Sequence, residues 1–179
     1  MPERDLLMIP GPTMVDPAVL RAMAAPVISM SAPEFLEIFG STLEGVRTVL
    51  GARTGQTFVI AGSGHLALEF GVANLVEAGD RVLLVDTGFF ASRYRLICER
   101  YEAQLTALTA TLGDVVPLDT IEAELKQAAD AGKPYKVVHV VHVDTSTDVA
   151  EDIAGIGRLA HQYGALLSVD GVCAAAGME

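Results

Sequence analysis

Between residues 57 and 170, short β-forming segments alternate with longer segments of helical periodicity. This alternation restricts the fold more than any other feature, because strand–helix–strand units build a parallel sheet through right-handed crossovers. The expected strands cover residues 57–61, 81–86, 103–110, 135–144 and 164–170. The expected helices cover residues 64–78, 89–101, 119–131 and 152–163. We therefore predict a three-layer α/β fold: a mostly parallel sheet with helices on both faces.

Residues 1–56 lack this alternation and are predicted to form an N-terminal segment with two helices. Aspartate followed by proline at residues 16–17 is typical of an N-cap and a first helical position, so one helix is expected near residues 17–24. Ser31 and Glu34 have the spacing of a capping box and predict the start of the second helix. The same spacing, Asp119 to Glu122, is expected to open the helix over 119–131.

Composition argues against several classes of partner. The formal net charge is −11, with 23 acidic and 12 basic residues and no cluster of Lys and Arg, so no nucleic-acid partner is expected. No apolar run is long enough to cross a bilayer and no signal peptide is recognisable, so we expect a cytoplasmic protein without membrane association. Cys98 and Cys173 have no paired spacing and are expected to be buried, reduced thiols. No spacing typical of metal ligands occurs.

Ligands of open parallel sheets bind at the carboxyl ends of the strands. Four loops follow those ends here and carry polar or glycine-rich stretches, at residues 62–65, 86–90, 142–148 and 170–172. The first loop, Gly-Ser-Gly-His, leads into a helix N-terminus, where amides and the helix dipole favour an anion such as a phosphate. The sequence therefore predicts a site either for a dinucleotide or for a cofactor with a single phosphate.

The dinucleotide hypothesis rests on Gly62, Gly64 and Ala67, which fit the pattern G-x-G-x-x-A between a strand and a helix. Asp86, at the end of the next strand, would contact the ribose. This hypothesis predicts a nicotinamide-dinucleotide-binding domain. An ordinary tight turn between a strand and a helix has the same pattern.

The monophosphate hypothesis uses all four loops. Ser63 and the neighbouring amides would hold the phosphate, and Phe90 or its neighbour Phe89 could stack on an aromatic ring. Asp170 could pair with a protonated pyridine nitrogen, and Ser146 could donate a hydrogen bond nearby.

The chain resembles the class V aminotransferases of fold type I, which depend on pyridoxal 5′-phosphate (PLP), and among them the alanine–glyoxylate/serine–pyruvate group. Four segments carry the resemblance in order along the chain: IPGPTMVDPAVLRAM, GSGHLALE, DTSTDV and SVDGVCAAAG. It implies that residues 57–179 are part of a PLP-binding large domain. It also implies amino transfer from a small amino acid, alanine or serine, to a small 2-oxo acid, glyoxylate or pyruvate, by a homodimer or together with a complementary chain.

Six residues match positions that surround the cofactor in this family. Those implied near the phosphate are Ser63, Gly64 and His65, and those implied near the ring are Phe90, Ser146 and Asp170. Phe90 would stack on the pyridine ring, and Ser146 would hydrogen-bond beside it. The implied catalytic residue is Asp170, because its pairing with the pyridinium nitrogen makes the ring an electron sink.

The sequence also departs from the family. The Schiff-base lysine of the family follows the aspartate strand, whereas Lys126, Lys133 and Lys136 all precede Asp170, so none can take its role. We expect a chain truncated before that lysine and before the C-terminal small domain, and inactive alone; a non-catalytic partner subunit is the alternative. Asp148 stands where the family usually has glycine, and its charge would repel a phosphate. The segment ISMSAPEF lacks the His or Arg that often precedes PEF.

Overall fold

A computed structural model describes residues 6–9 and 11–178 of the chain. The chain divides into two compact units, Met1–Val59 and Ile60–Glu179, each of which is described by itself. The sequence-based boundary between residues 56 and 57 stays a prediction. No described helix is both long and apolar enough to cross a membrane.

The first unit contains the two predicted helices, α1 (Pro17–Met23) and α2 (Pro33–Val49). The predicted cap of α1 is confirmed, because Asp16 Oδ1 accepts a hydrogen bond of 2.6 Å from the amide of Ala18. Neither helix has a buried residue. The apolar face of α2 therefore has no core to pack against within the described part of this unit.

Both predicted capping boxes are wrong, although the helices they were meant to open are present. The N-cap of α2 is Ala32 rather than Ser31, and helix α5 (Leu118–Asp130) has Pro117 at its N-cap and Asp119 in its first turn. Neither helix has a side-chain cap. A proline lies at the start of each helix, Pro33 as the first residue of α2 and Pro117 as the N-cap of α5. The fixed φ of proline favours the beginning of a helix there.

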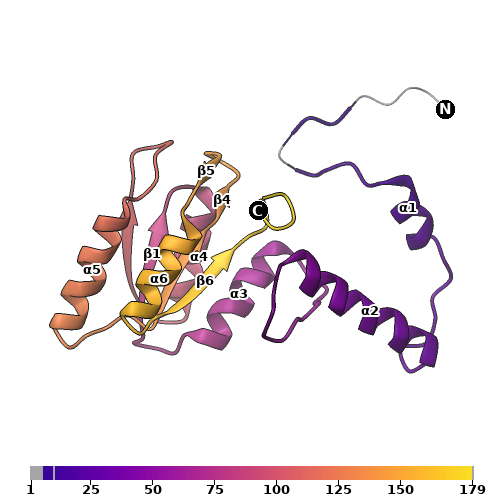
Figure 1. Ribbon diagram of the computed structural model, residues 1–179, viewed down its shortest axis with the longest axis horizontal. Helices are drawn as coiled ribbons and strands as arrows, with labels where there is room; N and C mark the ends of the chain where they lie inside the picture. Colours follow the sequence, from indigo (N-terminus) through magenta and orange to yellow (C-terminus); the bar gives the residue numbers. More distant parts are fainter. Residues whose placement is uncertain (1–5, 10, 179) are drawn as a thin grey trace. The chain divides into compact units, whose positions relative to one another are not determined.

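The second unit has the predicted three-layer α/β architecture (Figure 1). Its sheet has four parallel strands in the order β2-β1-β3-β6, and β4 and β5 form a separate antiparallel pair. The strands are β1 (Arg81–Asp86), β2 (Gln104–Thr109), β3 (Val137–Val141), β4 (Val143–Asp144), β5 (Val149–Ala150) and β6 (Leu166–Asp170). The remaining helices are α3 (Gly64–Leu75), α4 (Phe89–Arg100) and α6 (Ile153–Gln162).

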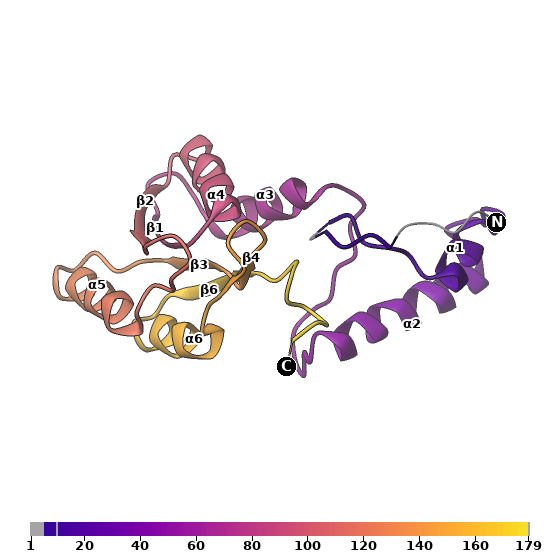
Figure 2. The same ribbon diagram turned by 90° about the horizontal axis from the view of Figure 1, so that it is seen from above.

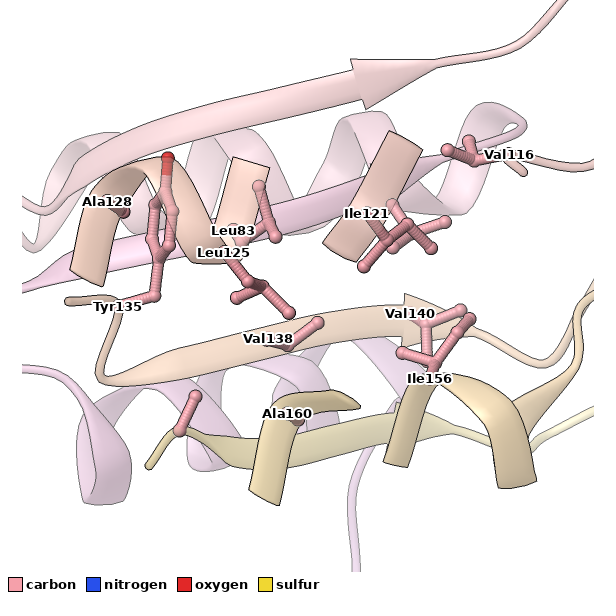
Figure 3. Close-up of a cluster of buried hydrophobic side chains, with 12 residues drawn as sticks. Leu83, Val116, Ile121, Leu125, Ala128, Tyr135, Val138, Val140, Ile156 and Ala160 are labelled. Atoms are coloured by element: carbon pink, nitrogen blue, oxygen red, sulfur yellow. The ribbon is translucent and has the colours of Figure 1, made fainter. Parts of the chain in front are cut away.

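Helices cover both faces of the sheet, α3 and α4 on one and α5 and α6 on the other (Figure 2). Because side chains alternate along a strand, Leu83 and Val138 join the core beneath α5 and α6, whereas Val82 and Val137 join the core beneath α3 and α4. The core beneath α5 and α6 is drawn in Figure 3. Every residue of β3 is buried, as expected for a central parallel strand.

The strand predicted at residues 57–61 is absent. Phe58 is 69% exposed, and no described segment pairs with these residues. A strand needs a neighbour to satisfy its amides and carbonyls, so β-forming composition alone does not make one. The strand predicted over 135–144 ends at Val141, and the chain then turns into the β4–β5 pair.

A polar side chain, His139, lies inside the core beneath α4. Its ring stacks on that of Tyr94, with centroids 3.4 Å apart, and its Nδ1 is 3.0 Å from Ser168 Oγ on β6. His139 is 2% exposed, and burial lowers its pKa to about 3. The imidazole is therefore neutral in the folded chain at neutral pH.

Burial of neutral His139 predicts acid sensitivity. In the unfolded chain the imidazole takes up a proton below its ordinary pKa of 6.5, whereas the folded chain resists protonation down to about 3. Stability contributed by the neutral ring is thus complete above pH 6.5 and is lost as the pH falls toward 3. The loss approaches about 1.4 kcal/mol per pH unit.

Urea unfolding at several pH values measures this effect. His139→Gln should flatten the decline of the free energy of unfolding between about pH 6 and about pH 4, a window that lies between the pKa of 6.5 in the unfolded chain and the pKa of about 3 in the folded chain. His161→Gln, which changes an exposed histidine of α6, should leave the decline unchanged. Equal slopes in wild type and His139→Gln would show that His139 does not cause the acid sensitivity.

Candidate cofactor site

The carboxyl ends of three strands lie side by side at one edge of the sheet. The register pairs Val85 with Val140 and Val141 with Asp170, so β1, β3 and β6 finish together. The segments at these strand ends contain Phe90 in the first turn of α4, the 142–148 stretch and the 170–172 stretch, in the places that the sequence predicted. A common edge for these loops is what a ligand site of an open parallel sheet requires.

Asp170, the last residue of β6, is half-buried at this edge. One carboxylate oxygen, Oδ1, accepts a hydrogen bond of 3.0 Å from the amide of Val172. Ser168 contacts His139 on the face covered by α3 and α4, so two-residue alternation directs Asp170 to that same face. No hydrogen bond to Oδ2 occurs within the described residues, which leaves this oxygen to accept from a ligand.

The loop before α3 lies on the same side of the sheet. Helix α3 begins on the side toward which β6 points (Figures 1 and 2), and Leu68 and Val72 pack it onto the face that Asp170 shares. Ser63 caps this helix, with its Oγ accepting from the amide of Leu66 at 3.3 Å. The first amides of a helix have no partner within the helix, so this exposed turn can hold an anion.

The residues predicted at the phosphate all belong to this turn. Ser63, Gly64 and His65 are exposed, and a Cβ at Gly64 would meet no atom within 4 Å. Gly62 is different, because a Cβ there would lie 2.3 Å from the Leu66 side chain. Contact with the exposed Leu66 side chain therefore also favours glycine at this position, independently of a dinucleotide.

Phe90 and Ser146 are brought together by a residue that sequence reasoning missed. Asp144 is fully buried, and its Oδ2 accepts from the Phe90 amide at 2.9 Å. Its Oδ1 accepts from the amide of Ser146 at 2.9 Å and from the hydroxyl of Ser146 at 2.6 Å. The available signal is a carboxylate that ends an apolar run directly before Thr145 and Ser146, within the 142–148 stretch, to which the sequence analysis gives no role of its own.

The two adjacent phenylalanines lie in different surroundings. Phe90 is half-buried and packs against the core beneath α3 and α4, whereas Phe89 is 46% exposed and has the Arg93 guanidinium 4.4 Å from its ring centroid. Their rings meet edge to face. Ser146 Oγ accepts from the Phe89 amide at 3.0 Å, and its hydrogen is donated to Asp144. Ser146 is therefore left with one lone pair, which can only accept.

Asp148 takes up the backbone conformation that glycine would adopt more easily. Its φ is +55°, and its amide donates to the carbonyl of Asp144 at 2.8 Å. This turn between β4 and β5 is held to the end of β1 by Thr147, whose hydroxyl donates to the carbonyl of Thr87 at 3.0 Å. The turn thus forms without the usual glycine, because aspartate tolerates left-handed backbone better than most residues.

The dinucleotide hypothesis loses its acidic residue. Asp86 Oδ2 lies 2.5 Å from the Arg95 guanidinium of α4, and the Asp86 side chain is 13% exposed. A carboxylate engaged in this way is poorly placed to accept from a ribose.

The three lysines lie away from this edge. Lys136 precedes β3 at the amino end of the sheet, about 16 Å from the carboxyl end if β3 rises about 3.3 Å per residue. Its Nζ is 2.5 Å from Asp80 Oδ2, and this bond raises the pKa of Lys136, which keeps the amine charged. Lys126 is paired with Asp130 on α5, and Lys133 follows that helix.

One cysteine prediction is wrong. Cys98 is buried as expected, and burial raises the pKa of its thiol to about 11. Cys173 is exposed, because it lies in the turn after β6 rather than in the core, with its Sγ 2.8 Å from Thr145 Oγ1. Within residues 6–9 and 11–178, no three His, Cys, Asp or Glu side chains form a group that could hold a metal ion.

Comparison with known proteins identifies the family of the chain and solved structures with the same fold. The family model described as "Aminotransferase class-V" matches residues 7–179. The chain is 33% identical to the L-aspartate–glyoxylate aminotransferase of Paracoccus denitrificans, covering 100% of this chain and 45% of that protein. It is 35% identical to alanine–glyoxylate aminotransferase 1 of Saccharomyces cerevisiae, over 94% of this chain and 45% of that protein. The solved structure of the ureidoglycine–glyoxylate aminotransferase of Bacillus subtilis matches this chain with a TM-score of 0.90 and 31% identity, over 100% of this chain and 46% of that one.

The strained turn at Asp148 yields a prediction on stability. Its side chain is exposed, so substitutions mainly test the backbone conformation. Asp148→Val should lower the free energy of unfolding by about 1–2 kcal/mol, because a β-branched residue is disfavoured at positive φ. Asp148→Gly should be at least as stable as wild type, and Asp148→Asn unchanged. Urea midpoints measure all three; a Val variant as stable as the Gly variant would contradict the assigned φ.

Proposed function

Because this chain belongs to aminotransferase class V, we propose that it is the N-terminal portion of a PLP-dependent aminotransferase. The chain spans about 45% of the length of the curated relatives it matches. The observation that carries the proposal is the placement of Asp170 and the α3 N-terminus on one face and at one edge of the sheet. These are the two groups that would hold opposite ends of a phosphorylated pyridine.

The residues at this edge fit the chemistry of PLP. The exposed first turn of α3, with Ser63, Gly64 and His65, supplies amide donors for the phosphate. Phe90 supplies an aromatic face, and Asp170 Oδ2 is available to accept from the ring nitrogen. When bound, PLP supplies an electron sink for a substrate carbanion. The contribution of Asp170 is to hold a proton on that nitrogen, and Ser146 accepts one further hydrogen bond.

We propose that the amino acceptor is a small 2-oxo acid, glyoxylate or pyruvate, and that the donor is a small amino acid such as alanine or serine. The names of the three relatives share glyoxylate and differ in the donor, which supports the acceptor more strongly than the donor. The exposed apolar face of α2, with Ile38 and Val49 each more than half exposed, suits a homodimer or a complementary chain. We also propose a cytoplasmic location.

The proposed function predicts PLP binding. Equilibrium dialysis should detect PLP binding by the 179-residue chain, and inorganic phosphate should compete for it. Asp170→Asn should raise the Kd for PLP about tenfold, the effect of losing about 1.4 kcal/mol from a charge-assisted hydrogen bond. Asp130→Asn removes the same charge from exposed α5 and should leave the Kd unchanged. Binding of NAD(H) in place of PLP would reverse the choice between the two hypotheses.

The second prediction concerns turnover. Amino transfer needs a neutral lysine amine beside the cofactor, whereas Lys126 lies on α5, Lys133 follows α5 and Lys136 lies at the amino end of the sheet. The 179-residue chain with added PLP should therefore not convert alanine and glyoxylate to pyruvate and glycine. Lactate dehydrogenase coupling follows pyruvate, and a full-length class V enzyme is the positive control. Turnover by this chain would refute our account of the lysines.

A further inference from the structure

Helix α4 is capped by side chains from a distant part of the chain. The N-cap residue, Gly88, has no side chain that could accept a hydrogen bond. The first two amides of the helix donate instead to side chains of the β4–β5 region. The Phe89 amide donates to Ser146 Oγ at 3.0 Å, 57 residues away in sequence, and the Phe90 amide donates to Asp144 Oδ2 at 2.9 Å, 54 residues away. The cap thus joins the loops that follow β1 and β3.

Asp144 is the centre of this junction. Its carboxylate is 0% exposed and accepts three hydrogen bonds, one from Phe90 and two from Ser146. A Cβ on Gly88 would lie 2.3–2.6 Å from the Asp144 carboxylate atoms, so the absence of a side chain at that residue makes room for it. The φ of Gly88 is 178°, an extended value that any residue adopts, so glycine is needed here for space alone.

Burying a carboxylate costs more free energy than burying a neutral capping side chain would. No Lys, Arg or His of the described chain forms an ion pair with Asp144, so its buried charge is stabilised by hydrogen bonds and by the N-terminal dipole of α4. A neutral Ser or Asn caps a helix as well as Asp does. What a neutral side chain does not provide is two acceptor oxygens that hold Phe90 and Ser146 at once.

We propose that Asp144 is a positioning residue for the cofactor, which fixes the aromatic face of Phe90 and the hydroxyl of Ser146 relative to each other. This inference rests on the proposed binding of PLP. The carboxylate does not touch the cofactor; it acts through the first turn of α4 and the β4–β5 turn. Because the Ser146 hydroxyl donates its hydrogen bond to Asp144 Oδ1, Ser146 can act toward the ring only as an acceptor.

Two substitutions break the junction from opposite sides. Asp144→Asn leaves one acceptor oxygen, so either Phe90 or Ser146 loses its bond. Gly88→Ala keeps the carboxylate group of Asp144 but displaces it, because the added Cβ would lie 2.3–2.6 Å from its atoms. Each should raise the Kd for PLP about tenfold in equilibrium dialysis. Each should also weaken the visible circular dichroism of bound PLP, which arises only when an asymmetric site holds the ring.

The chain offers a matched control pair. Asp152 caps α6 by accepting from the Gly155 amide at 2.8 Å, and a Cβ on Gly155 would lie 2.4 Å from Asp152 Oδ2. This cap begins α6, which packs on the opposite face of the sheet from α3 and α4. Asp152→Ala removes that cap and Gly155→Ala crowds it, so each should lower the melting temperature while the Kd for PLP and the circular dichroism stay at wild-type values.

Hydrogen exchange without PLP provides an independent readout. The amides of Phe89, Phe90 and Ser146 should exchange faster in Asp144→Asn and Gly88→Ala than in wild type. Unchanged PLP affinity and dichroism in both variants would overturn the positioning role, as would an equal loss in the control pair, which would reduce the effect to general stability. Absence of PLP binding by the wild type would instead refute the proposed function, and this inference with it.

Discussion

The pairing of β3 with β1 on one side and β6 on the other is the constraint on which the second unit depends. All five residues of β3 are buried, and the register sets Val141 opposite Asp170. A slip of one residue between β3 and β6 would turn every side chain of β6 to the other face, Asp170 included. The face on which the candidate catalytic carboxylate lies is therefore determined by the backbone ladder, and the hydrogen bond from the Val172 amide only orients the side chain locally.

Buried polar groups in this unit join elements that are remote in sequence. His139 and Ser168 link β3 to β6 beneath α4, and Asp144 links α4 to the turn after β3. A polar group without a partner would destabilise the core, so these pairs also specify which elements lie together. They lie on the side of the sheet where α3 and α4 pack, which is the side that we propose for the cofactor.

Local sequence patterns predicted the elements of the second unit well because its core strands are apolar and short and its helices are periodic. The same patterns failed where the outcome depends on a partner. Residues 57–61 have the composition of a strand, but no described part of the chain pairs with them. Ser31 has the spacing of a cap but lies ahead of a helix that begins at Pro33. Cys173 is hydrophobic by type, yet it lies in an exposed turn.

The sequence by itself determined the fold class, the order of strands and helices, and the chemistry available at the strand ends, since each of these depends on residue type and spacing along the chain. Only the tertiary structure decided which ends meet. The union of Phe90 and Ser146 through Asp144, the space left by Gly88, and the engagement of Asp86 by Arg95 all depend on how the elements pack. Contacts between distant residues are set by packing and register, and a linear pattern does not contain them.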